Sequence, residues 1–109
     1  MDNTQPVAQD LRDFINMEFV KRKTLNKKRS SYGIKHYVER RIGRRDKYVS
    51  NGELINAMIA CGFDYELTHP GSPNYHFNVS EKSFRPMTEA EAIKYDGNIN
   101  TVKSIMDYV

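Results

Sequence analysis

Residues 50–63, SNGELINAMIACGF, carry the most restrictive pattern in the chain, because they specify a helix at its start, along its length and at its end. Ser50 and Glu53 stand three positions apart, as in a capping box, where each side chain accepts from the other residue's backbone amide. Gly62 is placed to end the helix, with Phe63 as its apolar neighbour. The apolar positions between them have helical spacing and predict one buried face: Leu54, Ile55, Met58 and Ile59.

A second helix and a β-hairpin are predicted on either side of this segment. Ser30 or Ser31 can cap a helix that runs to about residue 42 and ends at Gly43. Residues 65–68 and 75–79 alternate apolar and polar side chains around HPGSPN, which is typical of a hairpin. Two consecutive helices followed by a hairpin is the element order of a winged helix-turn-helix.

The N-terminal residues are expected to form a further helix. Residues 5–22 show the spacing of an amphipathic helix. Lys21, Arg22 and Lys23 would then fall at its C-terminal end, where the helix dipole favours cations. Residues 24–29, TLNKKR, are expected to form a polar connection to the next helix.

The C-terminal residues predict two more short helices. Thr88 and Glu91 offer a second capping box, opening a helix to about residue 95, and residues 99–106 predict a last helix. The fold class expected is α+β, a small, mostly helical, winged-helix-like domain with a helix-turn-helix-like pair and a β-hairpin. We expect a single domain over residues 1–109, with an N-terminal helix and basic connector in 1–29, a helix-helix-hairpin core in 30–83 and a helical segment in 84–109.

The size and cysteine content fit one cytoplasmic domain. The chain has 109 residues, which is enough for a modest core without disulfides or metals. Cys61 is the only cysteine, so no intramolecular disulfide is possible, which fits a reducing compartment. The first residues lack the features of a secretory signal, and no apolar run reaches membrane-spanning length, so no membrane association is expected.

The positive charge is concentrated in the centre of the sequence. The net charge is only +3, yet residues 21–47 hold twelve Lys and Arg against Glu39 and Asp46. Both flanking segments carry more acidic than basic residues. Because such a local block exceeds what solubility requires, it favours an acidic partner.

The basic block provides the candidate binding residues. His36, Arg40, Arg44 and Lys47 would align along one side if the helix turn continued past Gly43. The alternative is a solvated helix face on which Lys35 pairs with a glutamate four residues later. The candidates are Lys27, Lys28, Arg29, Lys35, His36, Arg40, Arg41, Arg44, Arg45 and Lys47.

The helix predicted at residues 51–61 does not look like a base-reading helix. It contains no Arg or Lys, and its polar side chains are Asn51, Glu53 and Asn56. Asn56 could pair with an adenine edge, but an ordinary exposed position is the simpler interpretation. Non-specific contact with a nucleic-acid backbone, or contact with an acidic or nucleoprotein partner, therefore fits better than sequence-specific reading.

Catalysis and metal binding find little support. His36 and Glu39 would share a helix face, but two ligands do not make a metal site. Cys61 ends an apolar helix face and is expected to act as a small hydrophobe. No nucleophile–base grouping or glycine-rich phosphate loop occurs at useful spacing. We therefore expect no enzyme activity, no cofactor and no metal.

About half of the chain, residues 30–83, resembles a group of small accessory proteins carried by bacteriophages, prophages and plasmids. The shared pattern is S-Y-G-x-K-H-x-x-E, then Y-V-S-N-x-E, then a helix ending in Gly-aromatic, then P-N-x-x-F. Its positions here are Ser31, Tyr32, Gly33, Lys35, His36, Glu39, Tyr48, Val49, Ser50, Asn51, Glu53, Gly62, Phe63, Pro73, Asn74 and Phe77.

The resemblance implies a setting rather than an activity. Small proteins of mobile elements often bind host machinery, including defence nucleases such as CRISPR effectors. The leading hypothesis is a non-enzymatic module in the host cytoplasm whose basic surface binds nucleic acid or a host nucleoprotein complex. The alternative is an anti-defence inhibitor, of anti-CRISPR type, that contacts a host nuclease mainly through protein. DNA, RNA and protein partners all remain open, as does the oligomeric state.

Overall fold

The structure, a computed structural model, describes residues 6–96. Across these residues the chain forms four α-helices, one short 3-10 helix and three β-strands, which confirms the α+β class. In chain order the elements are α1 (Gln9–Glu18), β1 (Lys21–Asn26), α2 (Ser31–Glu39), α3 (Asn51–Ala60), β2 (Tyr65–Leu67), β3 (Tyr75–Val79), η1 (Glu81–Ser83) and α4 (Glu89–Asp96).

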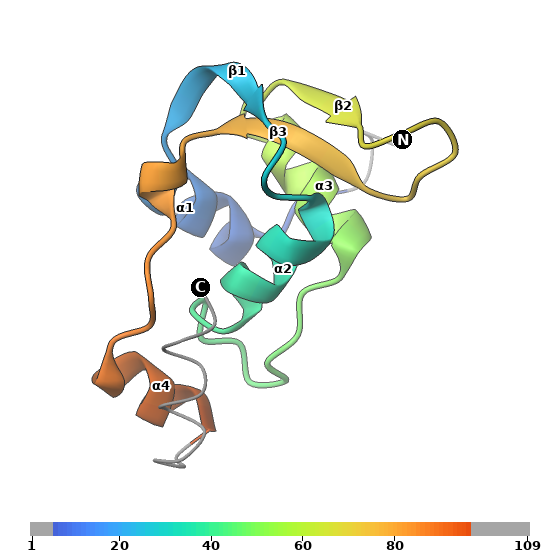
Figure 1. Cartoon of the computed structure of the whole chain (residues 1–109). Helices are drawn as coiled ribbons and strands as arrows, with labels where there is room; N and C mark the ends of the chain where they lie inside the picture. The colour runs from blue at the N-terminus through green and yellow to red at the C-terminus, as the bar shows by residue number, and fades with distance from the viewer. Residues whose placement is uncertain (1–5, 97–109) are drawn as a thin grey trace.

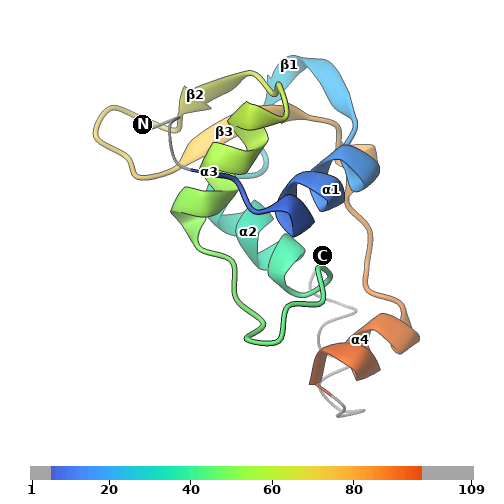
Figure 2. The ribbon, with the colours of Figure 1, turned by 180° about the vertical axis from the view of Figure 1, so that it is seen from behind.

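The strands form one antiparallel sheet in the order β1-β3-β2. β2 and β3 pair with Tyr65 opposite Phe77 and Leu67 opposite Tyr75, which confirms the predicted hairpin. Figure 1 shows the sheet along the top of the molecule, α1, α2 and α3 beneath it, and α4 at the far end after an extended segment. Seen from behind in Figure 2, α1 and α3 lie in front of α2.

One hydrophobic core joins the first three helices to the sheet. β3 is the central strand, and its Phe77 and Val79 point into the core and are fully buried. Burial of a large apolar side chain contributes about 1.5–3 kcal/mol, so these residues hold the layers together. The fully buried helical residues of the same cluster are Leu11, Ile15, Ile34, Val38, Leu54, Ala57 and Met58.

Helix α3 has the termini that its sequence predicts. Ser50 Oγ accepts from the Glu53 amide at 3.1 Å, and a Glu53 carboxylate oxygen accepts from the Ser50 amide at 3.2 Å. At the other end, Gly62 has φ +88°, and its amide donates to Ile59 O. The Phe63 amide donates to Met58 O, which completes a Schellman motif. Helix α3 is thus fixed by local contacts at both ends.

The predicted helix over residues 5–22 is wrong at its C-terminal end. Helix α1 stops at Glu18, and Phe19 is extended with ψ 130°. Strand β1 takes up the last two residues of the predicted helix and the first half of the predicted polar connection at residues 24–29. Pairing with β3 outweighs the local helical pattern, because it satisfies the backbone amides and carbonyls of this segment in the sheet.

The predicted helix to about residue 42 also ends earlier than expected. Helix α2 runs to Glu39, and the next residues form a turn in which the amides of Arg41 and Ile42 both donate to Val38 O. The capping box of α4 is confirmed by hydrogen bonds between Thr88 and Glu91. The predicted helix at residues 99–106 lies outside the described residues. Within residues 6–96, no helix is long and apolar enough to cross a bilayer.

Candidate functional site

Residues 40–49, called the connector below, leave α2, turn and enter α3. Gly43 and Lys47 both have positive φ, at +83° and +57°. Such values are rare for a residue other than glycine, so the chain is sharply folded at Lys47. The Lys47 amide donates to Arg44 O at 3.1 Å, which closes the turn. The helix does not continue past Gly43, so the predicted straight basic stripe does not form.

Because the connector is folded, its cationic side chains instead lie around one cavity. This cavity, of about 420 Å³, lies between the end of α2, the connector and α4. Glu39 and Glu91 are the carboxylates that line it, and Tyr95 of α4 closes one side. Five predicted site residues line the same cavity: Arg40, Arg41, Arg44, Arg45 and Lys47.

Arg44 holds the connector in place rather than facing solvent. Its guanidinium donates to both Asp10 carboxylate oxygens, at 2.8 and 3.0 Å, and also to Glu53. It further donates to Tyr48 O at 3.2 Å. The hydrogen bond from Arg44 holds the pKa of Asp10 below its ordinary value. Arg44 therefore ties the connector to α1 and to the capping box of α3.

Arg41 is likewise engaged within the fold. Its Nη1 donates to Tyr37 O at 2.9 Å and its Nη2 to Arg85 O at 2.7 Å. The guanidinium lies 3.6 Å from the centre of the Tyr37 ring. Burial lowers the pKa of Arg41, although an arginine remains charged at neutral pH. Arg41 thus joins α2 to the segment that leads to α4.

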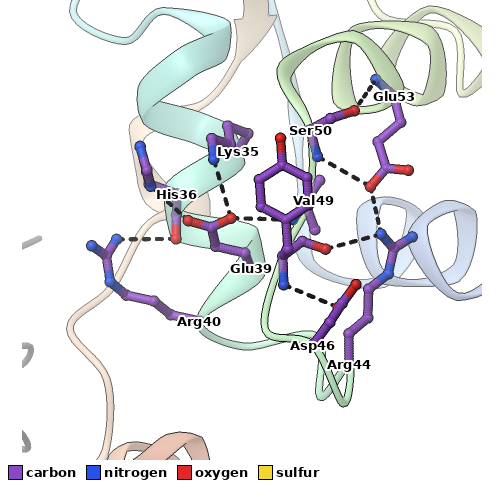
Figure 3. Close-up of polar contacts among 10 residues, drawn as sticks. Lys35, His36, Glu39, Arg40, Arg44, Asp46, Val49, Ser50 and Glu53 are labelled. Atoms are coloured by element: carbon purple, nitrogen blue, oxygen red, sulfur yellow. Dashed lines mark hydrogen bonds and ion pairs between the residues drawn. The ribbon is translucent and has the colours of Figure 1, made fainter.

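Lys35 and His36 form a buried polar network with Glu39 (Figure 3). Glu39 accepts from Lys35 Nζ at 3.2 Å and from the Val49 amide at 3.1 Å, and His36 Nδ1 lies 2.6 Å from its other oxygen. Burial raises the pKa of Glu39, but these hydrogen bonds outweigh it and the pKa falls below its ordinary value. The network attaches the end of the connector to α2, so the predicted Lys35–Glu39 pair is structural.

The remaining connector cations are more accessible. Arg45 and Lys47 are exposed, and their side chains form no hydrogen bond or ion pair within residues 6–96. The Lys47 ammonium lies 5.2 Å from the centre of the Tyr95 ring, where a cation is mildly attracted. Arg40 is half-buried and donates to His36 O at 3.0 Å. Arg45 and Lys47 carry charge that the cavity presents to solvent.

The predicted site residues Lys27, Lys28 and Arg29 do not join this cavity. They precede the first turn of α2, whereas the connector follows its last turn, so about 13 Å of helix separates the two groups. Arg29 forms a bidentate pair with Glu81, at 2.9 and 3.0 Å, and lies over the Phe84 ring. Lys27 and Lys28 are exposed in the turn after β1.

A second set of basic residues, which was predicted at a helix end, lies on β1. Lys21, Arg22 and Lys23 are all exposed on this edge strand, at the opposite end of the molecule from the connector (Figure 1). The Lys21 ammonium contacts the Phe63 ring, and Arg22 donates to backbone carbonyls of its own strand. Charged side chains on an edge strand discourage unwanted strand pairing. The basic composition was the signal available in the sequence, but only the strand pairing shows that these residues lie on an exposed edge strand.

Helix α3 offers little surface for reading bases. Asn51 Nδ2 donates to Pro73 O and to Asn74 Oδ1, which ties the start of α3 to the hairpin loop. Asn56 is half-buried, and its Oδ1 has no hydrogen-bond partner within the described part of the chain. No cluster of three or more potential metal ligands occurs within residues 6–96.

Three of the residues that carry the expected resemblance, Ser31, Asn51 and Asn74, meet at one structural junction. Ser31 Oγ accepts from the Tyr75 amide and lies near Asn74, which in turn accepts from Asn51. These contacts hold α2, α3 and the hairpin together, so this part of the pattern has a structural role. Comparison of the chain with models of protein families, with characterised proteins and with solved structures finds no match.

Proposed function

We propose that the protein is a non-enzymatic binding module that holds the phosphate backbone of a nucleic acid, free or within a nucleoprotein complex, at the connector. The observation that carries this proposal is the gathering of five cationic side chains around one cavity of about 420 Å³. Arg45 and Lys47 would contact phosphates, while Arg41 and Arg44 hold the connector in shape. Contacts of this kind give affinity and position without sequence specificity.

We further propose that residues 9–79 form a winged helix-turn-helix. The order helix, strand, helix, helix, strand, strand supports this, as does the placement of β1 beside β3. The loop between β2 and β3 would then be the wing, and α3 the helix that usually reads bases. Because α3 lacks cations and its Asn51 is bound to the hairpin loop, the proposed interface lies on the connector instead.

The proposal is tested by measuring binding of labelled duplex DNA, single-stranded DNA and RNA by fluorescence anisotropy over a salt series. The connector variant is Arg45→Glu/Lys47→Glu, and the matched control is Lys23→Glu/Lys27→Glu. Both double variants change the net charge of the protein by the same amount, and all four positions are exposed. We expect the connector variant to weaken binding and to reduce the salt slope by about two, since each lost phosphate contact removes about one.

Two results would overturn the proposal. One is the absence of binding to every probe at about 50 mM salt, where phosphate contacts are much stronger than at physiological salt. The other is an equal loss of affinity in the connector and control variants, which would mean that overall charge, and not this cavity, attracts the nucleic acid.

A second candidate function is inhibition of a host defence nuclease through protein contact, in the cytoplasm of a host cell. It is supported by strand β2, an edge strand whose three residues are all exposed and include Tyr65 and Leu67. An exposed apolar edge is a common site of protein association. Affinity purification from a host lysate, with and without nuclease treatment, separates the candidates, because only a direct protein complex survives removal of nucleic acid.

A further inference from the structure

Two tyrosine rings stand exposed beside one buried ammonium next to the connector. Tyr32 of α2 and Tyr48 at the end of the connector expose 55% and 53% of their surface. The Lys35 Nζ lies 5.8 Å from the centre of the first ring and 4.8 Å from the centre of the second. Residues from two segments are thus brought to one place by the folding of the connector.

A purely structural role does not account for both rings. Lys35 itself is only 7% exposed, and its charge is already compensated by Glu39. The Tyr32 ring packs edge-on against the His36 ring, with centroids 4.5 Å apart. By contrast, Tyr37 of the same helix is 3% exposed and belongs to the core. Tyr32 and Tyr48 therefore leave about half of their surface exposed to water.

Tyr48 directly follows Lys47, which lines the proposed phosphate-binding cavity, and Tyr32 lies one turn before His36 on α2. Arg44 of the cavity donates to the carbonyl of Tyr48, and Arg40 donates to the carbonyl of His36, one turn after Tyr32. Figure 3 shows Lys35 and Glu39 of α2 facing the connector segment that carries Val49, with His36 and Arg40 on the other side of Glu39. A ligand whose anionic groups lie at the cavity would therefore place its adjacent, uncharged groups near the two rings.

We propose that Tyr32 and Tyr48 stack on nucleobases of a single strand whose phosphates lie at the connector. This inference rests on the proposed function and narrows its ligand to single-stranded nucleic acid, because duplex bases are already stacked on each other. Combining a cationic groove with exposed aromatic rings is the usual way in which proteins hold single strands without sequence preference.

The test compares single-stranded and duplex probes of one sequence, with Tyr32→Ala and Tyr48→Ala. Since alanine removes the stacking surface, each change should weaken single-strand binding by roughly 5- to 100-fold and leave duplex binding within about twofold. Tyr32→Phe and Tyr48→Phe keep the ring and should retain wild-type affinity. Tyr65→Ala is the matched control, since Tyr65 is a comparably exposed tyrosine on β2. Circular dichroism would verify that each variant is folded.

The outcomes separate this inference from the proposed function. If Arg45→Glu/Lys47→Glu abolishes binding but neither alanine variant weakens single-strand binding, the connector is the site and the stacking role is wrong. An equal loss for duplex and single strand, or the same loss in Tyr65→Ala, also overturns it. If no probe binds at all, both the proposed function and the stacking role fail. The inference is supported if the alanine variants lose affinity for the single strand alone and the phenylalanine variants keep wild-type affinity.

Discussion

Replacing Glu39 with glutamine tests whether the buried network holds the connector in place. The Lys35 and Glu39 side chains are each only 9% exposed, so Glu39→Gln would leave a nearly buried ammonium without its counter-charge. Removing one member of a buried ion pair costs about 3–5 kcal/mol. Because solvent still reaches a little of Lys35, we expect the lower end, a loss of about 3 kcal/mol in the free energy of unfolding.

The assay is urea unfolding followed by circular dichroism at neutral pH, with Lys35→Met and the double variant completing a double-mutant cycle. The double variant should be more stable than Glu39→Gln, because it no longer buries an unpaired charge. For a domain of about 100 residues, a loss of about 3 kcal/mol lowers the melting temperature by roughly 15 °C. A loss below about 1 kcal/mol, with no coupling between the two positions, would show that the network contributes little.

The pH dependence gives an independent check on the same residue. The pKa of Glu39 in the folded protein lies below its ordinary value of 4.5, so its ionised form stabilises the fold above that pH. This contribution is lost as the pH falls through the folded pKa. The difference in stability between wild type and Glu39→Gln should therefore shrink as the pH falls below about 4.5. Other carboxyl groups are shared by both proteins and largely cancel.

Three further predictions concern individual side-chain contacts. Arg44→Ala removes the tie between α1 and the connector, and should cost about 1–3 kcal/mol in urea unfolding, as for a partly buried charged hydrogen bond; an unchanged midpoint would contradict this. Ser50→Ala should cost about 1 kcal/mol, since the α3 cap is lost, whereas Ser50→Asp should retain most of the stability. Arg85 lowers the pKa of Glu91 to about 2, so an NMR titration of the Glu91 carboxyl should show its midpoint well below 4.5, and Arg85→Gln should raise it.

Features that depend on neighbouring residues were predicted correctly. Both capping boxes, at Ser50–Glu53 and Thr88–Glu91, are present, as is the glycine that ends α3. A cap needs only residues within one turn of the helix end, so the sequence contains all of the information. The hairpin could be predicted equally well, because its alternating apolar and polar residues and its turn residues occur within one short segment.

Strand β1 could not be predicted in the same way. The helical spacing of the preceding residues corresponds to a real helix, α1, as far as Glu18, and the cations of β1 suited the end of such a helix. The strand exists because β3, more than fifty residues later, offers a free edge to pair with. Pairing over that distance leaves no local pattern, so the residues that it turns outward, Lys21 to Lys23, were placed on the wrong element.

The candidate site shows the same division between local and distant causes. The sequence by itself determined that the positive charge is concentrated between residues 21 and 47, and that α3 carries none of it. Only the tertiary structure decided how each cation is used, because Arg44 and Arg29 find their carboxylates on distant elements, at Asp10 and Glu81. The turn at Gly43 and Lys47 then brought the remaining connector cations to one cavity, since a folded backbone places side chains by position in space rather than by spacing along the chain.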